Sequence, residues 1–119
     1  SIPPALPHIR SGRLKLLAVA SARRAAQLPD VPTVSEAGVS GFEAITWFGF
    51  VAPARTPRQI VARLNELVVK VVRAPELKSQ FEILGYEAVG GSPGEFAAFI
   101  RAESEKYAKA VKLSGAKVD

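Results

Sequence analysis

The sequence predicts an α/β fold, and three observations support that prediction. Residues 14–20 form a nearly continuous apolar run, which is typical of a strand covered on both faces in a parallel sheet flanked by helices. Residues 60–72 place apolar side chains at helical spacing. Predicted helices and strands alternate along the 119 residues without internal repeats or low-complexity segments, which is typical of an α/β protein.

The chain begins with a short predicted helix followed by a strand. Residues 5–10 favour a helix because a proline lies in the first turn and Gly12 follows the last. The apolar run at 14–20 comes next and is interpreted as a buried strand.

A loop of defined shape then precedes a capping signal. In the polar segment 21–32, Pro29 and Pro32 favour extended backbone and exclude a helix between them. Residues 33–36 read Thr-Val-Ser-Glu, which is a capping box, because the Thr hydroxyl and the Glu carboxylate can each accept from an unpaired amide at a helix start. We expect a short helix there that ends at Gly38.

Residues 42–52 predict a long strand. The segment has eleven residues rich in aromatic and β-branched types, and it exceeds the usual strand of about five or six residues. A strand of that length can link two lobes. Trp47, the single tryptophan, lies near its middle, and three roles remain open for it: core residue, hinge residue or pocket wall.

The second half of the chain is mainly helical. Residues 56–59 read Thr-Pro-Arg-Gln, a second capping box with proline at the first helical position. The helix that follows places its apolar residues on one face: Ile60, Val61, Leu64, Leu67, Val68, Val71 and Val72. Pro75 starts a further helix that Gly85 ends, and a brief strand is expected at 86–89.

A third capping box, Ser-Pro-Gly-Glu at 92–95, opens the last helix, which ends at Gly115. Its expected inward residues are Phe96, Ile100, Tyr107 and Val111. Residues 117–118 could add a final strand position. The glycine-rich turn at 90–94 has two readings, an anion site at a helix start or a tight turn that leads into the capping box.

The residue inventory excludes several kinds of catalytic and metal chemistry. There is no cysteine, so disulfides, cysteine zinc sites and thiol nucleophiles are excluded. The single histidine, His8, has no ligand-type partner three or four residues on, so no metal site is expected. Asp30 and Asp119 are the only aspartates, and no serine triad can be assembled with His8. The chain is therefore not expected to be an enzyme or to need a cofactor.

The net charge of +5 favours anionic partners without specifying one. Basic residues are scattered, and Arg23–Arg24 is the only adjacent pair, whereas nucleic-acid-binding surfaces usually gather such residues beside aromatics. Nucleic acid is therefore not an expected partner. Apolar runs fall far short of the ~18 residues that a membrane-spanning helix requires.

Several stretches, taken together, resemble one known family. These stretches are ALPHI at 5–9, SGRLK at 11–15, LAVAS at 17–21, LPDVPTV at 28–34, EAG at 36–38, WFG at 47–49, AP at 52–53, TP at 56–57 and IVARLN at 60–65. Their order and spacing resemble the Bug, or TctC-like, extracytoplasmic solute receptors of tripartite tricarboxylate transporters. The resemblance extends over the whole chain.

The resemblance implies the C-terminal portion of a two-lobed periplasmic binding protein, or Venus-flytrap, fold. On that basis residues 1–45 are expected to be a remnant of the second lobe, 46–52 the crossover strand between lobes, and 53–119 the C-terminal part of the first lobe. It also implies a periplasmic location, a small organic acid or related solute as ligand, and membrane transporter subunits as partners. By position, the expected ligand-binding residues are Ser1, Ile2, Pro3, Thr46 and Trp47.

The sequence leads to three further expectations. Sequence upstream of residue 1 is expected, because the first four residues read like a loop. Apolar surface left without cover in such a partial chain would favour a dimer or an exchange of segments between copies. The alternative function is a small basic interaction module that binds nucleic acid or a protein partner.

Overall fold

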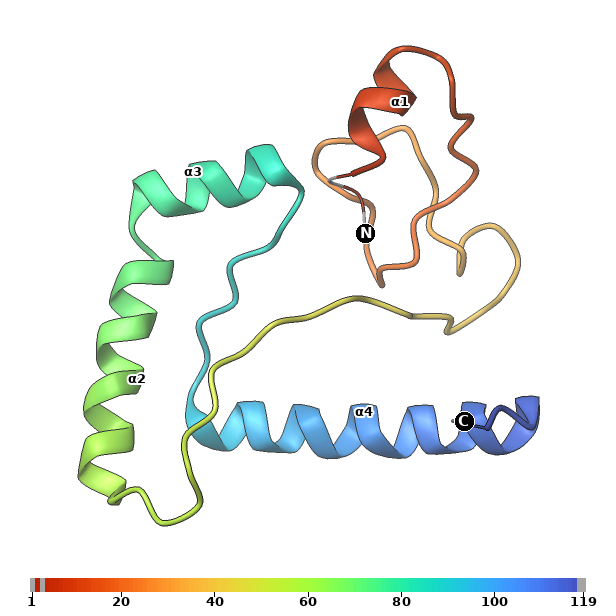
Figure 1. The fold of residues 1–119 in the computed structure, drawn as a ribbon. Coiled ribbons are helices and arrows are strands. Elements are labelled where there is room, and N and C mark those ends of the chain that lie inside the picture. Colours follow the sequence, from red (N-terminus) through yellow and green to blue (C-terminus); the bar gives the residue numbers. More distant parts are fainter. Residues whose placement is uncertain (1, 3, 118–119) are drawn as a thin grey trace. The chain divides into compact units, whose positions relative to one another are not determined.

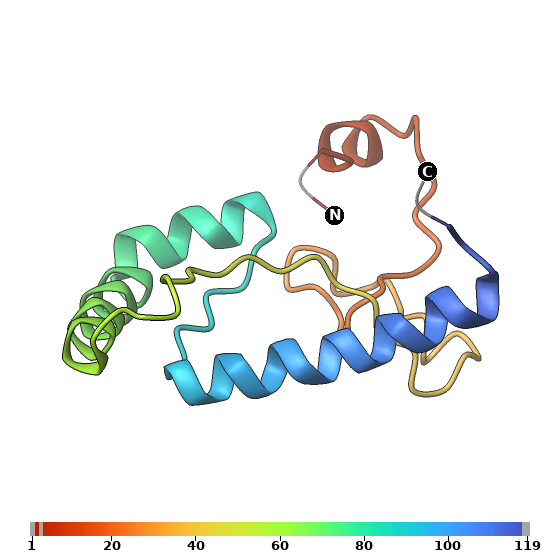
Figure 2. The same cartoon turned by 60° about the horizontal axis from the view of Figure 1, so that its bottom comes forward.

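The computed structural model describes residues 2 and 4–117, and Figures 1 and 2 show it from two directions. That part of the chain contains four helices: α1 (Leu6–Arg10), α2 (Arg58–Val72), α3 (Pro75–Leu84) and α4 (Pro93–Ser114). Contacts divide the chain into two units, the first made of residues 1–51 and 73–88 and the second of residues 52–72 and 89–119. The predicted helices at these four places are confirmed, whereas position 118 of the expected final strand lies outside the described residues.

The N-terminal helix α1 forms where its proline and glycine signals predict it. The carbonyl of Ile2 accepts hydrogen bonds from the amides of Ala5 and Leu6, at 3.0 and 3.1 Å, which starts the first turn. Leu6 is buried. Gly12 follows the helix with φ of 71°, a conformation that glycine adopts without the penalty a Cβ would bring.

The strand predicted at 14–20 does not form. The β-type pairing of this segment in the described residues is a single parallel bridge between Val19 and Thr33. The Val19 amide donates to the Pro32 carbonyl, and the Val34 amide donates to the Val19 carbonyl, both at 2.9 Å. Val19 is buried, but Leu17 is 74% exposed, so the expected cover on both faces is also missing. A strand needs a hydrogen-bonded neighbour along its length, and here the neighbour reaches only one residue.

The predicted strands at 42–52 and 86–89 likewise form no ladder within the described residues. The amide of Ala44 donates to the carbonyl of Ala20 at 2.9 Å, and the pairing does not continue from there. β-Branched and aromatic composition favours extended backbone, but it supplies no partner strand. The strand assignments are therefore wrong, although residues 42–52 follow an extended course in Figure 1.

The predicted helix after Thr33 is a single turn. The Ala37 amide donates to the Thr33 carbonyl at 2.9 Å, and Gly38 then adopts φ of 121°. One hydrogen-bonded turn fixes several dihedral angles for little gain, so a helix that glycine ends this early does not propagate. The capping box at Thr33 is correctly predicted, whereas the short helix expected after it does not form beyond one turn.

In the second unit, α2 and the N-terminal end of α4 lie beside each other in both views (Figures 1 and 2). The capping box at the start of α4 is complete: the Ser92 hydroxyl accepts from the Glu95 amide at 3.2 Å, and the Glu95 carboxylate accepts from the Ser92 amide at 2.7 Å. Farther along α4, Tyr107 and Val111 are exposed, so the predicted inward face is wrong there. The contact with α2 lies at the other end of the helix, near Pro93.

None of the helices in residues 2 and 4–117 combines the length and the apolar character that crossing a bilayer demands.

Candidate functional site

The first group of predicted ligand residues lies at the start of α1. Ser1 and Pro3 lie outside the described residues. Ile2 is described, and its carbonyl already accepts two helix amides, so this acceptor is used within the chain. Its side chain is half-buried.

The second predicted group, Thr46 and Trp47, lies on the extended segment between Ala44 and the start of the second unit. Both side chains are exposed to solvent, Trp47 by 37%. An exposed hydroxyl beside an exposed aromatic ring can present a hydrogen-bonding group and a flat apolar wall to one ligand. Ile2 belongs to the same unit, and a ligand shared among these residues stays a prediction.

An aromatic cluster follows Trp47 directly and was missed by the sequence reasoning. The ring of Phe48 meets the ring of Tyr86 edge to face, with centroids 6.0 Å apart and planes at 85°. Phe81 on α3 meets the same Tyr86 ring at 6.4 Å and 79°. This cluster connects the segment that holds the predicted site residues to a helix. The only sequence signal for it is an aromatic residue directly after Gly85.

A second structured region brings Arg24 to the capping box at Thr33. The Glu36 carboxylate accepts from the Thr33 amide and from Arg24 Nε, each at 2.9 Å, and Glu36 in turn donates its amide to the Thr33 hydroxyl at 3.0 Å. Arg24 also donates to the Pro29 carbonyl at 3.2 Å. Gln27 in the same loop donates to the Glu82 carbonyl of α3. The sequence predicted the capping box at Thr33 but not the hydrogen bond that Arg24 donates to its Glu36 carboxylate.

These contacts lower the pKa of Glu36 below its ordinary value of about 4.5, first through the Thr33 amide and then through the Arg24 guanidinium. A carboxyl group with a lowered pKa stabilises the fold above its ordinary pKa, and this stabilisation is lost as pH falls through the folded-state value. We therefore expect the urea midpoint of the chain to fall below pH 4.5, and the Glu36→Gln variant to show a weaker dependence on pH.

Glu87→Gln, which changes an exposed glutamate of the same unit, is the matched control for this pH series. Equal pH dependence in the Glu36→Gln variant and the unmodified chain would show that the Glu36 contacts contribute nothing to stability.

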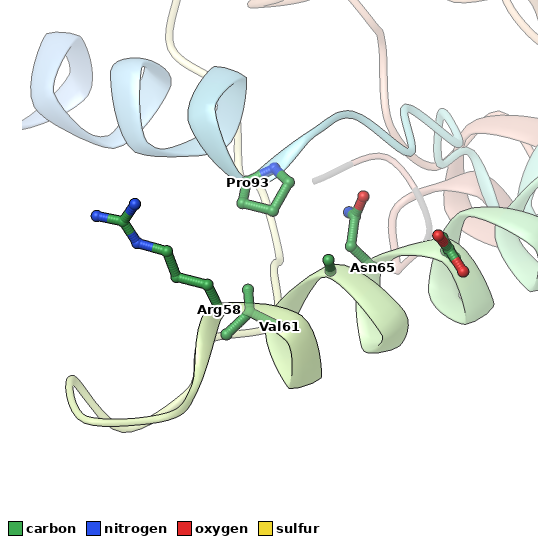
Figure 3. Close-up of a pocket in the computed structure, with 6 residues that line it drawn as sticks. Arg58, Val61, Asn65 and Pro93 are labelled. Atoms are coloured by element: carbon green, nitrogen blue, oxygen red, sulfur yellow. The ribbon is translucent and has the colours of Figure 1, made fainter.

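In the second unit, an open hollow of about 400 Å³ lies between the start of α2 and the start of α4 (Figure 3). Its lining residues are Arg58, Val61, Ala62, Asn65, Glu66 and Pro93. Asn65 donates to the Gly91 carbonyl at 2.9 Å, which ties α2 to the turn before α4. The amides of Ser92 and Glu95 already bond within the capping box, which favours the tight-turn reading of residues 90–94 over an anion site.

Glu103 on α4 is buried, which is unusual for a glutamate unless its charge is paired. Its side chain pairs with Lys106 three residues on, and among the described residues its second carboxylate oxygen has no hydrogen-bond partner. In the same part of the chain, no three His, Asp or Glu side chains lie close enough to hold a metal ion.

Comparison with known proteins decides the family. Residues 1–115 match the family model described as the tripartite tricarboxylate transporter family receptor. The chain belongs to this receptor family. It is 40% identical over 105 residues to a UPF0065 protein from a Pseudomonas species, and 34% identical over 118 residues to the protein BugT of Bordetella pertussis. These alignments cover 87% and 99% of this chain but only 31% and 36% of those relatives.

Two solved structures are similar in fold to this chain. R. palustris Rpa4515 with adipate has a TM-score of 0.81 at 34% identity, and the match covers 96% of this chain and 38% of that protein. The periplasmic binding protein BugD has a TM-score of 0.79 at 31% identity, covering 93% of this chain and 38% of BugD. The predicted fold class is confirmed: the chain is a portion of the two-lobed periplasmic binding protein fold.

The matched solved structures are longer than this chain. Nearly the whole chain follows the backbone path of a protein more than twice its length. Within the described residues, segments 14–20 and 42–52 have a paired neighbour only at Val19. The family assignment also favours a solute receptor over the alternative of a small basic interaction module.

Proposed function

We propose that this chain is part of a periplasmic receptor that captures a small carboxylate and delivers it to the membrane subunits of a tripartite transporter, without catalysing a reaction. The observation that supports this most directly is the similarity to Rpa4515 with adipate, which extends over 96% of the chain. The family description supports the transporter as partner. Because the chain spans about a third of the length of the curated relatives it matches, the proposal concerns the receptor to which this chain contributes.

The residues proposed to contact the ligand are those predicted from the sequence. The Thr46 hydroxyl can donate to a carboxylate oxygen, and the Trp47 ring can cover the alkyl part of the ligand. In the loop Ser1-Ile2-Pro3, backbone N–H groups for the ligand would come by position from Ser1 and Ile2, because proline has no N–H. Binding of this kind uses amides, hydroxyls and ordered water, and it needs no cofactor.

The proposed lobe assignment is the one that the family resemblance implies. Residues 1–45 would belong to the second lobe, 46–52 would cross between lobes, and 53–119 would belong to the first. The change of unit between Val51 and Ala52 supports a crossing at that point. The grouping of residues 73–88 with residues 1–51 does not follow this scheme, so the extent of the first lobe stays a prediction.

The experiment is a chimera in which this chain replaces the matching segment of the adipate-binding R. palustris protein. We expect adipate to shift the Trp47 emission in a version whose other tryptophans are replaced, and calorimetry to give the affinity. Thr46→Ala and Trp47→Ala are each expected to weaken binding by at least about tenfold, since each removes a direct ligand contact.

Phe50→Ala is the matched control, because it removes an exposed aromatic ring from the same segment. A chimera that folds but binds neither adipate nor other mono-, di- or tricarboxylates would contradict the proposed function. A chimera that binds adipate equally well without Thr46 and Trp47 would contradict the proposed site only.

We also propose that two copies of this chain associate through α2. Four apolar side chains at helical spacing are between 44% and 57% exposed: Ile60, Leu64, Leu67 and Val71. A second copy carries the same uncovered apolar row, so pairing of the two rows would remove this surface from water.

A further inference from the structure

The C-terminal cap of α3 holds an aromatic residue in a fixed position. Gly85 adopts φ of 79°, its amide donates to the Glu82 carbonyl at 3.1 Å, and the Tyr86 amide donates to the Phe81 carbonyl at 2.8 Å. This pair of bonds is the Schellman motif, which commonly includes a contact between the same two side chains. The ring contact between Phe81 and Tyr86 supplies it. The Tyr86 backbone is therefore tied to the last turn of α3.

The ring of Tyr86 then reaches the segment that contains the proposed ligand residues. Its edge-to-face contact with Phe48 has the geometry that aromatic pairs prefer. Phe48 is 77% exposed, so most of its surface is open to solvent. Because few other contacts can hold the Phe48 ring, its contact with the Tyr86 ring is important for its orientation. The contact joins α3 to an extended segment that forms no ladder among the described residues.

Phe48 follows Trp47 directly, and successive side chains of an extended chain point to opposite sides. A Phe48 ring held by Tyr86 therefore sets the side on which the Trp47 ring is presented. We propose that Tyr86 is a positioning residue that orders Trp47 through Phe48, with the α3 cap as the rigid support. The part of this inference that concerns ligand affinity rests on the proposed function, whereas the part that concerns Trp47 order does not.

The first experiment uses the 119-residue chain without ligand. Because Trp47 is the single tryptophan, its fluorescence reports on this segment alone. In the Tyr86→Ala variant we expect lower Trp47 anisotropy and a roughly twofold larger acrylamide quenching constant, because the released side chain samples more rotamers. Tyr86→Phe keeps the ring and is expected to match the unmodified chain.

Two further variants separate the ring contact from general disruption. Tyr107→Ala removes the other tyrosine, which lies on α4 in the second unit, and is expected to leave Trp47 unchanged. Gly85→Ala strains the positive φ of the cap and is expected to act in the same direction as Tyr86→Ala. If Tyr86→Ala loses helical circular dichroism, Phe48→Leu tests the same contact from its other side.

Unchanged Trp47 quenching and anisotropy in folded Tyr86→Ala, or in Phe48→Leu if the former does not fold, would overturn the proposal. In the adipate-binding chimera, Tyr86→Ala is expected to lower affinity several-fold and Tyr86→Phe to restore it. If that chimera binds no carboxylate, the proposed function fails, while the quenching data still decide whether Tyr86 orders Trp47.

Discussion

Replacing Thr33 with valine is expected to destabilise the first unit by about 1–3 kcal/mol, the cost of leaving a partly buried donor without its acceptor. Thr33 is 1% exposed, so its side chain is almost completely buried. Its hydroxyl accepts the Glu36 amide at 3.0 Å, and its backbone forms the bridge with Val19. Valine has nearly the same shape but no hydroxyl, so the hydrogen bond is lost while the packing volume is retained.

Urea unfolding followed by Trp47 fluorescence measures this effect, because the single tryptophan lies in the same unit as Thr33. Thr33→Ser is the matched control, since it keeps the hydroxyl and removes only the methyl group, and it is expected to lose less stability. Equal or greater loss for serine than for valine would show that the methyl group, rather than the cap hydrogen bond, is what Thr33 contributes.

Placing two glutamates on α2, at Leu64 and Leu67, is expected to dissociate the proposed dimer. Both side chains belong to the exposed apolar row of this helix. An interface would bury the introduced carboxylates without partners, and the cost is expected to weaken association roughly 100-fold. Sedimentation velocity over a range of concentrations measures the change, and far-UV circular dichroism checks that the helices persist.

Leu113→Glu is the matched control, because it introduces the same charge at an exposed leucine on α4 and is expected to leave association unchanged. If the unmodified chain sediments as a monomer at all concentrations, the proposal is wrong. A dimer that survives both glutamates would place the interface elsewhere or indicate an exchange of segments.

Helix positions were predictable from sequence because their signals are local. Pro75 and Gly85 enclose α3, and the capping box at Ser92 precedes α4, as the short-range hydrogen bonds require. The capping box at Thr33 was also recognised, although only one turn follows it. In each case the deciding groups lie within a few residues of one another, so composition and spacing contain the necessary information.

Strand pairing and the environment of the candidate site were not predictable in this way. The apolar run at 14–20 predicted a strand, but whether a strand forms depends on a hydrogen-bonded neighbour, and in this run only Val19 is paired in that way within the described residues. Thr46 and Trp47 were selected through a family resemblance, and their ligand role stays a prediction. The contact of Phe48 with Tyr86 joins residues far apart in the chain, and no local pattern encodes such a contact.

By itself the sequence determined the four helices, the C-terminal cap of α3, the capping box of α4 and the receptor family, because periodicity, glycine and proline placement and motif order are properties of the chain alone. Only the tertiary structure decided that Arg24 donates a hydrogen bond to Glu36 of the Thr33 capping box and that the Tyr86 ring contacts the Phe48 ring. It also decided that α2 keeps an uncovered apolar row. These features depend on which distant segments meet, and that is set by the packing of the whole fold rather than by local conformational preference.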